Sequence, residues 1–330
     1  MLRWAILGTG FISNTVAEAI NQSDGSLVQV VAGRSVERVS AFQAAHSIPE
    51  SATSYDQAIA NPDVDAVYIG LPNHKHHDLA VQAAAAGKAI LSEKSLTTTM
   101  QSAQQLADGV RDKAFFVEGL MYLAHPLYPR LVEVIDDGRL GTIRSVTGRY
   151  AANISQVVNP EGRGTIYNLG CYPASLLHLV VQTAFGESAF AERTSWGAGN
   201  LTSDGTVGAA TLSVKFENGL LASLQSTDNY GMSHDFSIAA DNGVLRFETN
   251  PWLPAAGRNV LIWTAYGAEP EEIVVVDPFD AFYHQVRLVE RCVADGLTEA
   301  PRPSPRLVDS LEIMSLLTEW EALCLAQVSG

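Results

Sequence analysis

Residues 91–96 read Leu-Ser-Glu-Lys-Ser-Leu, so an acid and a base stand side by side where an apolar stretch ends. Taken alone, Glu93 and Lys94 could be an ordinary pair of solvated surface charges. A lysine held away from water beside a reacting alcohol could instead exchange protons near neutral pH, as general acid–base catalysis requires. The elements around the pair decide between these interpretations.

A second stretch with chemical potential is Gly8-Thr9-Gly10-Phe11-Ile12, which follows an apolar run at 2–7 and opens a predicted helix. The two glycines allow a tight turn and let backbone N–H groups approach a pyrophosphate, to which the helix N-terminus adds partial positive charge. Ser13 stands where a third glycine or alanine is usual. The strand–turn–helix context predicts a dinucleotide site; the alternative is a purely structural turn.

The second predicted strand ends in Ala32-Gly33-Arg34-Ser35, and Arg38 follows one helical turn later. An NAD site usually carries an acid here for the ribose 2′-hydroxyl, and this chain has none. A guanidinium and a hydroxyl suit a 2′-phosphate. We therefore expect NADP(H) in preference to NAD(H), with Arg34, Ser35 and Arg38 as candidate ligands; alternatively, Arg34 merely begins a helix in solvent.

Predicted strands and helices alternate over about residues 1–120, which indicates βαβ units and a parallel sheet. The strands are expected at 2–7, 27–32, 64–70, 88–91 and 114–119, and the helices at 12–21, 36–45, 54–61, 79–87 and 99–111. In such a sheet, ligands bind outside the carboxyl ends of the strands. Lys94 follows one of those ends, which favours the chemical interpretation of the pair.

The pattern changes after about residue 140. Strand-like runs follow at 143–152, 207–216, 220–228, 235–240, 244–249, 259–265 and 271–276, with hairpin signals Glu-Asn-Gly at 217–219 and Asp-Asn-Gly at 241–243. Helical periodicity is present at 169–185, 281–296 and 306–326. The predicted fold is α/β: an N-terminal Rossmann domain at 1–120, and an α+β domain at 121–330 with a large open, mostly antiparallel sheet.

Composition narrows the classes of partner. The 330 residues carry a formal net charge of −15, which argues against nucleic acid or an anionic membrane as partner. No apolar run approaches the roughly 20 residues needed to span a bilayer. Three widely spaced cysteines fit a reducing cytoplasm. His74, His76 and His77 lack a suitably spaced carboxylate or cysteine, so no metal is predicted.

With these motifs in place, the chain resembles the Gfo/Idh/MocA oxidoreductases. The resemblance rests on the Gly8 turn and on NPDVDAVYIGLPNHKHH, AAAAGKAILSEKSL, FVEGLMYLAHP and GRGTIYNLGCYP. It implies a Rossmann domain joined to an open antiparallel sheet, and association into a homodimer or homotetramer through that sheet. Tyr172, where many members have histidine, resembles the branch containing trans-dihydrodiol dehydrogenases, NADP-dependent xylose dehydrogenases and glucose–fructose oxidoreductase.

The resemblance also implies roles for individual residues. Leu71, Pro72 and Asn73 would line the cofactor site, with His76 at the start of the next helix. Glu93 would approach the nicotinamide ribose, and Lys94 the substrate carbinol. Asn168 and Tyr172 match a pair that is Asp with His or Tyr in the family, four residues apart and so on one helical face. Either Lys94 or Tyr172 is then the formal acid/base.

Four positions depart from the family pattern: Ser95 replaces proline, Asn168 replaces Asp, Arg163 stands where glycine is usual and Leu123 where arginine is frequent. Either the pocket is adapted to an unusual or anionic substrate that Arg163 clamps, or the chain binds its cofactor without efficient turnover.

The expected function is NADP(H)-dependent hydride transfer at a carbinol or carbonyl of a sugar, polyol or related cyclic alcohol. The alternatives are a non-catalytic NADP(H)-binding sensor or regulatory protein, and a hydrolase or epimerase that uses NAD(P) redox chemistry transiently.

Overall fold

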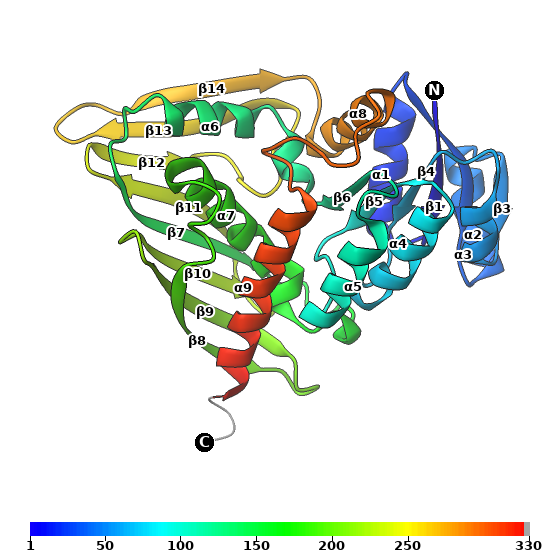
Figure 1. The fold of residues 1–330 in the computed structure, drawn as a ribbon, viewed down its shortest axis with the longest axis horizontal. Helices are drawn as coiled ribbons and strands as arrows, with labels where there is room; N and C mark the ends of the chain where they lie inside the picture. The colour runs from blue at the N-terminus through cyan, green and yellow to red at the C-terminus, as the bar shows by residue number, and fades with distance from the viewer. Residues whose placement is uncertain (327–330) are drawn as a thin grey trace. The chain divides into compact units, whose positions relative to one another are not determined.

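The computed structural model describes residues 1–326, which form two compact units (Figure 1). Unit 1 comprises Met1–Ala124 together with Ala281–Leu311. Unit 2 comprises His125–Asp280 and the chain from Glu312 on. The sequence suggested two contiguous domains, 1–120 and 121–330, whereas the chain returns to unit 1 after Asp280.

Unit 1 is built on a parallel sheet with the strand order β3-β2-β1-β4-β5-β6, which confirms the predicted Rossmann architecture. Helices cover its faces, so that β4, for example, is buried at every position. The strands are β1 (Leu2–Leu7), β2 (Ser26–Ala32), β3 (Glu50–Ala52), β4 (Ala66–Ile69), β5 (Ala89–Glu93) and β6 (Phe116–Gly119). The short β3 was not predicted.

The helices of unit 1 include one from far along the chain. They are α1 (Phe11–Gln22), α2 (Val36–His46), α3 (Tyr55–Ala60), α4 (His76–Ala85), α5 (Met100–Val110) and α8 (Ala281–Ala294). Helix α8 packs against α1, and its Val286, Val289 and Cys292 enter the same buried core as Trp4 and Ile6 (Figure 1). This shared core is the reason that the segment after Asp280 belongs to unit 1.

Unit 2 is built on a sheet with the order β14-β13-β12-β11-β7-β10-β9-β8, in which β10 runs parallel to β7 and the other neighbours pair antiparallel. The mostly antiparallel sheet was predicted, as were the hairpins at 217–219 and 241–243. The strands are β7 (Ile143–Ala152), β8 (Arg193–Leu201), β9 (Val207–Phe216), β10 (Leu221–Thr227), β11 (Met232–Ala240), β12 (Gly243–Phe247), β13 (Gly257–Ala265) and β14 (Glu271–Asp277).

One face of the unit 2 sheet carries helices and the other is open. Helix α6 (Leu127–Asp136) packs against β13, and α7 (Cys171–Phe185) crosses β7 and β10 (Figure 1). Along β9, Leu212 and Val214 are buried while Thr211 and Ser213 are exposed. Helix α9 (Leu307–Ala326) begins in unit 1 and continues in unit 2. Among the described residues, no helix is both long and apolar enough to cross a membrane.

Candidate active site

A cavity of about 390 Å³ opens in unit 1 beyond the carboxyl ends of β1, β2 and β4. It contains seven of the residues predicted to bind the cofactor. Its lining is Gly8, Thr9, Gly10, Gly33, Arg34, Ser35, Arg38, Tyr55, Gly70, Leu71 and Pro72. Tyr55 carries no motif in the sequence and was not predicted. The cavity lies where parallel sheets of this kind receive ligands.

The two glycines of the first turn are required for different reasons. Gly8 has a φ of +108°, and a Cβ there would lie 2.6 Å from the carbonyl oxygen of Gly70. A Cβ at Gly10 would meet no described atom within 4 Å, so glycine at this position leaves open space above the start of α1. Gly10 is the N-cap of α1 and offers no side-chain hydrogen bond to the first turn. The free N–H groups and the open space fit a pyrophosphate.

Ser13 replaces the usual third small residue without spoiling the packing of helix on strand. It is fully buried, and a Cβ on Gly70 would lie 2.4 Å from its hydroxyl oxygen. The extra volume of the serine is therefore accommodated by the absence of a side chain at Gly70.

Arginine side chains border the cavity beyond β2. Arg34 and Arg38 are exposed, and neither guanidinium makes a hydrogen bond or ion pair with the described residues. The Ser35 hydroxyl accepts a hydrogen bond of 3.3 Å from the backbone N–H of Arg38 and so caps α2. No Asp or Glu is found among the described lining residues. The lining is positively charged at this side, which suits a phosphate.

Three more of the predicted cofactor residues, Phe11, Ile12 and Asn73, adjoin the cavity lining in the chain. Phe11 is 86% exposed and Ile12 half-buried at the start of α1. Asn73 lies in a short 3₁₀ turn and is 8% exposed, and its Nδ2 has no hydrogen-bond partner among the described atoms. A buried amide without a partner is expensive, so Asn73 is suited to meet a polar ligand group.

His76 links the cavity wall to the turn that carries Lys94. The ring is fully buried; its Nε2 lies 2.7 Å from the carbonyl oxygen of Leu71 and its Nδ1 lies 3.0 Å from that of Ser95. Burial lowers the pKa of His76 to about 4, so the ring is neutral at pH 7 and can donate to one of these carbonyls at a time. Both nitrogens face backbone carbonyl oxygens, so His76 connects these two segments, and its predicted contact with the cofactor stays a prediction.

Lys94 directly follows Glu93, the buried acid that ends β5. Glu93 is 7% exposed; its Oε1 accepts a hydrogen bond of 2.9 Å from the hydroxyl of Tyr68, and its Oε2 accepts one of 3.3 Å from the backbone N–H of Lys94. Burial raises the pKa of Glu93, and the charge of Lys94 opposes this rise. The Lys94–Ser95 peptide bond is cis and Ser95 is fully buried. The pair is therefore part of a packed strand end and not a solvated surface feature.

Unit 2 holds the other predicted catalytic pair. Asn168 lies in a π-helical turn, Ile166–Gly170, that runs into α7. Its Nδ2 donates a hydrogen bond of 3.2 Å to Oδ2 of Asp228, an acid at the end of β10 that is 2% exposed. Burial raises the pKa of Asp228. A carboxyl therefore accompanies Asn168 even though residue 168 is not itself an acid. Sequence reasoning missed Asp228, because an acid at the end of an apolar strand becomes informative only once its neighbours in the fold are known.

Tyr172 lies in the first turn of α7 and is 6% exposed. Its ring meets that of Tyr150 edge-on at 5.2 Å between centroids, and that of Trp252 at 6.2 Å. These aromatic partners hold the ring of Tyr172 in place. The placement of Tyr172 relative to Lys94 remains a prediction, because the two residues belong to different units.

Arg163, which was predicted as a clamp for an anionic substrate, has an internal partner. Its guanidinium lies 2.7 Å from the carboxylate of Glu321, which also accepts a hydrogen bond of 2.8 Å from the Tyr167 hydroxyl. The backbone of Arg163 has a φ of +66°, the region that glycine adopts readily, which explains why glycine is usual there.

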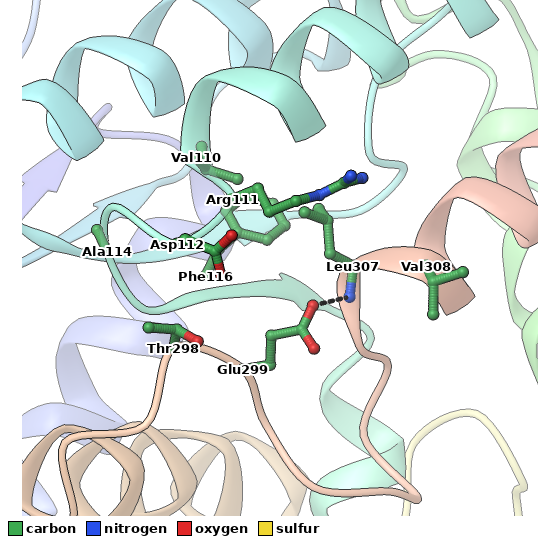
Figure 2. Close-up of a pocket in the computed structure, with 9 residues that line it drawn as sticks. All are labelled: Val110, Arg111, Asp112, Ala114, Phe116, Thr298, Glu299, Leu307 and Val308. Atoms are coloured by element: carbon green, nitrogen blue, oxygen red, sulfur yellow. Dashed lines mark hydrogen bonds between the residues drawn. The ribbon is translucent and has the colours of Figure 1, made fainter.

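Another cavity of unit 1, of about 370 Å³, lies near the amino end of β6 (Figure 2). Glu299 reaches into it and accepts a hydrogen bond of 3.1 Å from the backbone N–H of Leu307. It lies at the opposite end of the sheet from the dinucleotide cavity. We assign it no part in the chemistry.

The parallel sheet, the glycine turn and the cavity beyond it define a Rossmann-type dinucleotide-binding protein. Two family models match the chain: "Oxidoreductase family, NAD-binding Rossmann fold" over residues 2–117 and "GFO/IDH/MocA C-terminal domain" over residues 128–246. The chain belongs to the Gfo/Idh/MocA oxidoreductase family.

Similar proteins cover nearly the whole chain. A trans-1,2-dihydrobenzene-1,2-diol dehydrogenase of Xenopus tropicalis is 24% identical over 96% of each chain. A D-xylose 1-dehydrogenase (NADP(+)) of Haloferax volcanii is 28% identical, over 98% of this chain and 96% of the relative. A 3-ketoreductase from Actinomadura kijaniata, solved with NADP and TDP-benzene, shares the fold with a TM-score of 0.85, at 22% identity over 98% of each chain. With the family, these relatives identify an NAD(P)-dependent oxidoreductase.

Proposed function

We propose that this protein is an NADP(H)-dependent oxidoreductase that interconverts a carbinol and a carbonyl of a sugar, polyol or related cyclic alcohol. The observation that carries the proposal is the position of Lys94. It lies at the carboxyl end of β5, and His76 connects its turn to Leu71 in the wall of the dinucleotide cavity.

Oxidation of an alcohol removes a hydride from carbon and a proton from oxygen. A bound nicotinamide supplies the hydride acceptor or, in the reverse direction, the donor. Lys94 takes or returns the proton, and the Glu93 carboxylate next to it accepts a hydrogen bond from the backbone N–H of Lys94. Tyr172 is the second candidate for the proton-transferring group, with Asn168 beside it as a substrate ligand.

NADP(H) is the proposed cofactor because Arg34 and Arg38 border the cavity with uncommitted guanidinium groups. A charge-assisted hydrogen bond contributes about 1.5–3 kcal/mol, which corresponds to roughly a 10- to 100-fold change in affinity.

Calorimetric titration should show tighter binding of NADPH than of NADH. Arg34→Ala should weaken NADPH binding by about that factor and leave NADH binding nearly unchanged, whereas Arg111→Ala, an exposed arginine elsewhere in unit 1, should change neither. Equal affinity of the wild type for the two cofactors would contradict the proposal.

The substrate is proposed to be an uncharged polyol. Asn168 and Asp228 supply an amide and a carboxyl that suit hydroxyl groups, and Arg163, the cation predicted to clamp an anionic substrate, is already paired with Glu321. An anionic substrate would have to compete with Glu321 for this guanidinium.

A panel of aldoses, polyols and cyclic diols, assayed by nicotinamide absorbance, tests the activity. Lys94→Met should lower kcat by about 10²–10⁴-fold, the usual contribution of a general acid or base, while NADPH still binds. Tight NADPH binding without turnover on any member of the panel would favour a sensor, and product formation without net cofactor reduction would favour transient redox chemistry.

The open face of the unit 2 sheet is the proposed surface of self-association. Its exposed side chains include Thr147, Thr211, Ser213 and Ser223, opposite the face that α7 covers. Sedimentation equilibrium should show a dimer or tetramer that Ser213→Arg dissociates. A monomeric wild type at micromolar concentration would contradict this.

A further inference from the structure

Glu118 is a second buried acid at the strand end that carries Lys94. It is 3% exposed and lies in β6, which pairs in parallel with β5 so that Glu118 is opposite Ser92 and Gly119 is opposite Glu93. The register therefore places Glu93 and Glu118 on neighbouring strands at the same edge of the sheet, which is the edge where Lys94 follows β5.

The environment of Glu118 comes from several elements of unit 1. From the turn after β5, the Leu96 N–H favours its ionised form. The Ser310 hydroxyl of α9 acts in the same direction, but its Oγ makes no hydrogen bond of ordinary geometry with the described atoms. The charge of Lys94 acts in the same direction, and the charge of Glu93 opposes it. From α8, the amide of Gln285 lies against this edge, where a Cβ on Gly119 would be 3.5 Å from Nε2.

This set of groups does not fully satisfy Glu118. Its Oε2 has no hydrogen-bond partner among the described atoms, and the same holds for both polar side-chain atoms of Gln285. A buried carboxyl with an unsatisfied oxygen is expensive for stability. Its presence in an otherwise apolar strand is explained more readily by an electrostatic role at this edge than by packing.

We propose that Glu118 is a positioning residue for Lys94: when ionised, its carboxylate stabilises the ammonium of Lys94 and so sets the pH range over which the lysine can accept a proton from an alcohol. This inference rests on the proposed function of Lys94. Glu93 accepts hydrogen bonds from the Tyr68 hydroxyl and from the backbone N–H of Lys94, and so holds the backbone of the turn in place. Glu118 instead acts on the charge of the Lys94 side chain.

The carboxyl of Glu118 changes its ionisation state near neutral pH. Burial, with a smaller contribution from Glu93, raises the pKa of Glu118 to about 7. Near neutral pH the carboxyl therefore changes charge within the cluster. Above that pH, its negative charge holds the proton on Lys94 and opposes alcohol oxidation; below it, the opposition is absent.

The coupling can be measured without substrate or cofactor. In the full-length protein with ¹³C-labelled glutamate carboxyls, the resonance that Glu118→Gln removes should titrate near pH 7. Its midpoint should rise by about one unit in Lys94→Met and fall by about one unit in Glu93→Gln, whereas Lys94→Arg, which keeps the charge, should leave it close to the wild-type value. A midpoint that is the same in Lys94→Met and in the wild type overturns the proposal.

The effect on chemistry gives a second measurement. For alcohol oxidation, Glu118→Gln should move the acidic limb of the kcat/KM profile to lower pH by about one unit, because the variant lacks the charge that stabilises the ammonium. A purely structural role would lower the rate without moving the limb, and that outcome overturns the inference. Absence of turnover in the wild type contradicts the proposed function instead, and the carboxyl titration is independent of it.

Discussion

At the scale of single residues, His76 shows how one buried side chain can connect two parts of a candidate site. Its two nitrogens face the carbonyl oxygens of Leu71 and Ser95, so one ring joins the cavity wall to the turn after β5. Desolvation keeps this ring neutral at pH 7.

The depressed pKa of His76 predicts a pH-dependent stability. An unfolded histidine takes up a proton below about pH 6.5, whereas the folded one stays neutral until about pH 4. Lowering the pH through this window therefore favours unfolding, by up to about 3 kcal/mol. In urea titrations, the free energy of unfolding of the wild type should fall over this range relative to that of His76→Gln. A parallel fall in the wild type and the variant would rule out His76 as the source, and His234→Gln, at an exposed position, serves as the control.

Residue types at the site could be predicted in part. Lys94, Arg34 and the glycine turn follow from motifs, because their chemistry requires those types in that order. Glu118 and Asp228 could not be assigned from sequence, since an acid at the end of an apolar strand becomes informative only when the register shows what lies beside it. The pairing of Arg163 with Glu321 joins residues far apart in the chain, and no local pattern contains it.

At the scale of elements, the N-terminus of α1 and the carboxyl ends of β1 and β4 together form one wall of the dinucleotide cavity. Gly8 must approach Gly70 closely, whereas Gly10 faces open space. The two glycines should therefore respond differently to the same substitution.

Gly10→Ala should leave the fold nearly unchanged, with a change in unfolding free energy below about 1 kcal/mol, because its φ of −80° is allowed for alanine and no described atom is close. The added methyl group should nevertheless weaken NADPH binding by roughly tenfold or more, since it occupies ligand space. Gly8→Ala should lower both affinity and stability. Calorimetry and thermal unfolding measure the two effects; undiminished NADPH binding by Gly10→Ala would show that the dinucleotide lies elsewhere.

Most elements could be predicted from periodicity, and the exceptions have physical reasons. Strand β3 has only three residues, too few for a pattern. Strand β8 (RTSWGAGNL) alternates between half-buried and exposed residues and contains two glycines, so its apolar signal is weak. Helix α6 follows a His-Pro step and holds a second proline in its first turn, Pro129, which conceals its start.

At the scale of the whole molecule, the two units are not consecutive pieces of chain. The sequence could show that the folding pattern changes near residue 140, but not that α8 returns to the first unit. The amphipathic pattern of α8 predicts that one face of the helix is buried. It does not identify the surface against which that face packs.

This arrangement predicts that a substitution near the end of the chain destabilises the unit formed by its beginning. Val289 is fully buried in the core that contains Trp4 and Ile6. Val289→Ala should destabilise unit 1 by about 2 kcal/mol. Amide hydrogen exchange should accelerate in β1 and β4 more than in β10, whereas Val274→Ala, a 42% exposed position in β14, should leave β1 unchanged. Equal acceleration in both units would mean that they unfold together.

The return of the chain also has a consequence during synthesis. The core of unit 1 includes Ala300, so a nascent chain that has reached Ala124 lacks part of the surface that its first strands and helices need. At about 5–20 residues per second, the ribosome adds the missing segment roughly 10–35 s later. During that interval the nucleotide-binding half is incomplete and its apolar surface stays open to chaperones. Residues 281–300, which are translated after the whole sheet of unit 2, are thus needed to complete the unit that emerges first.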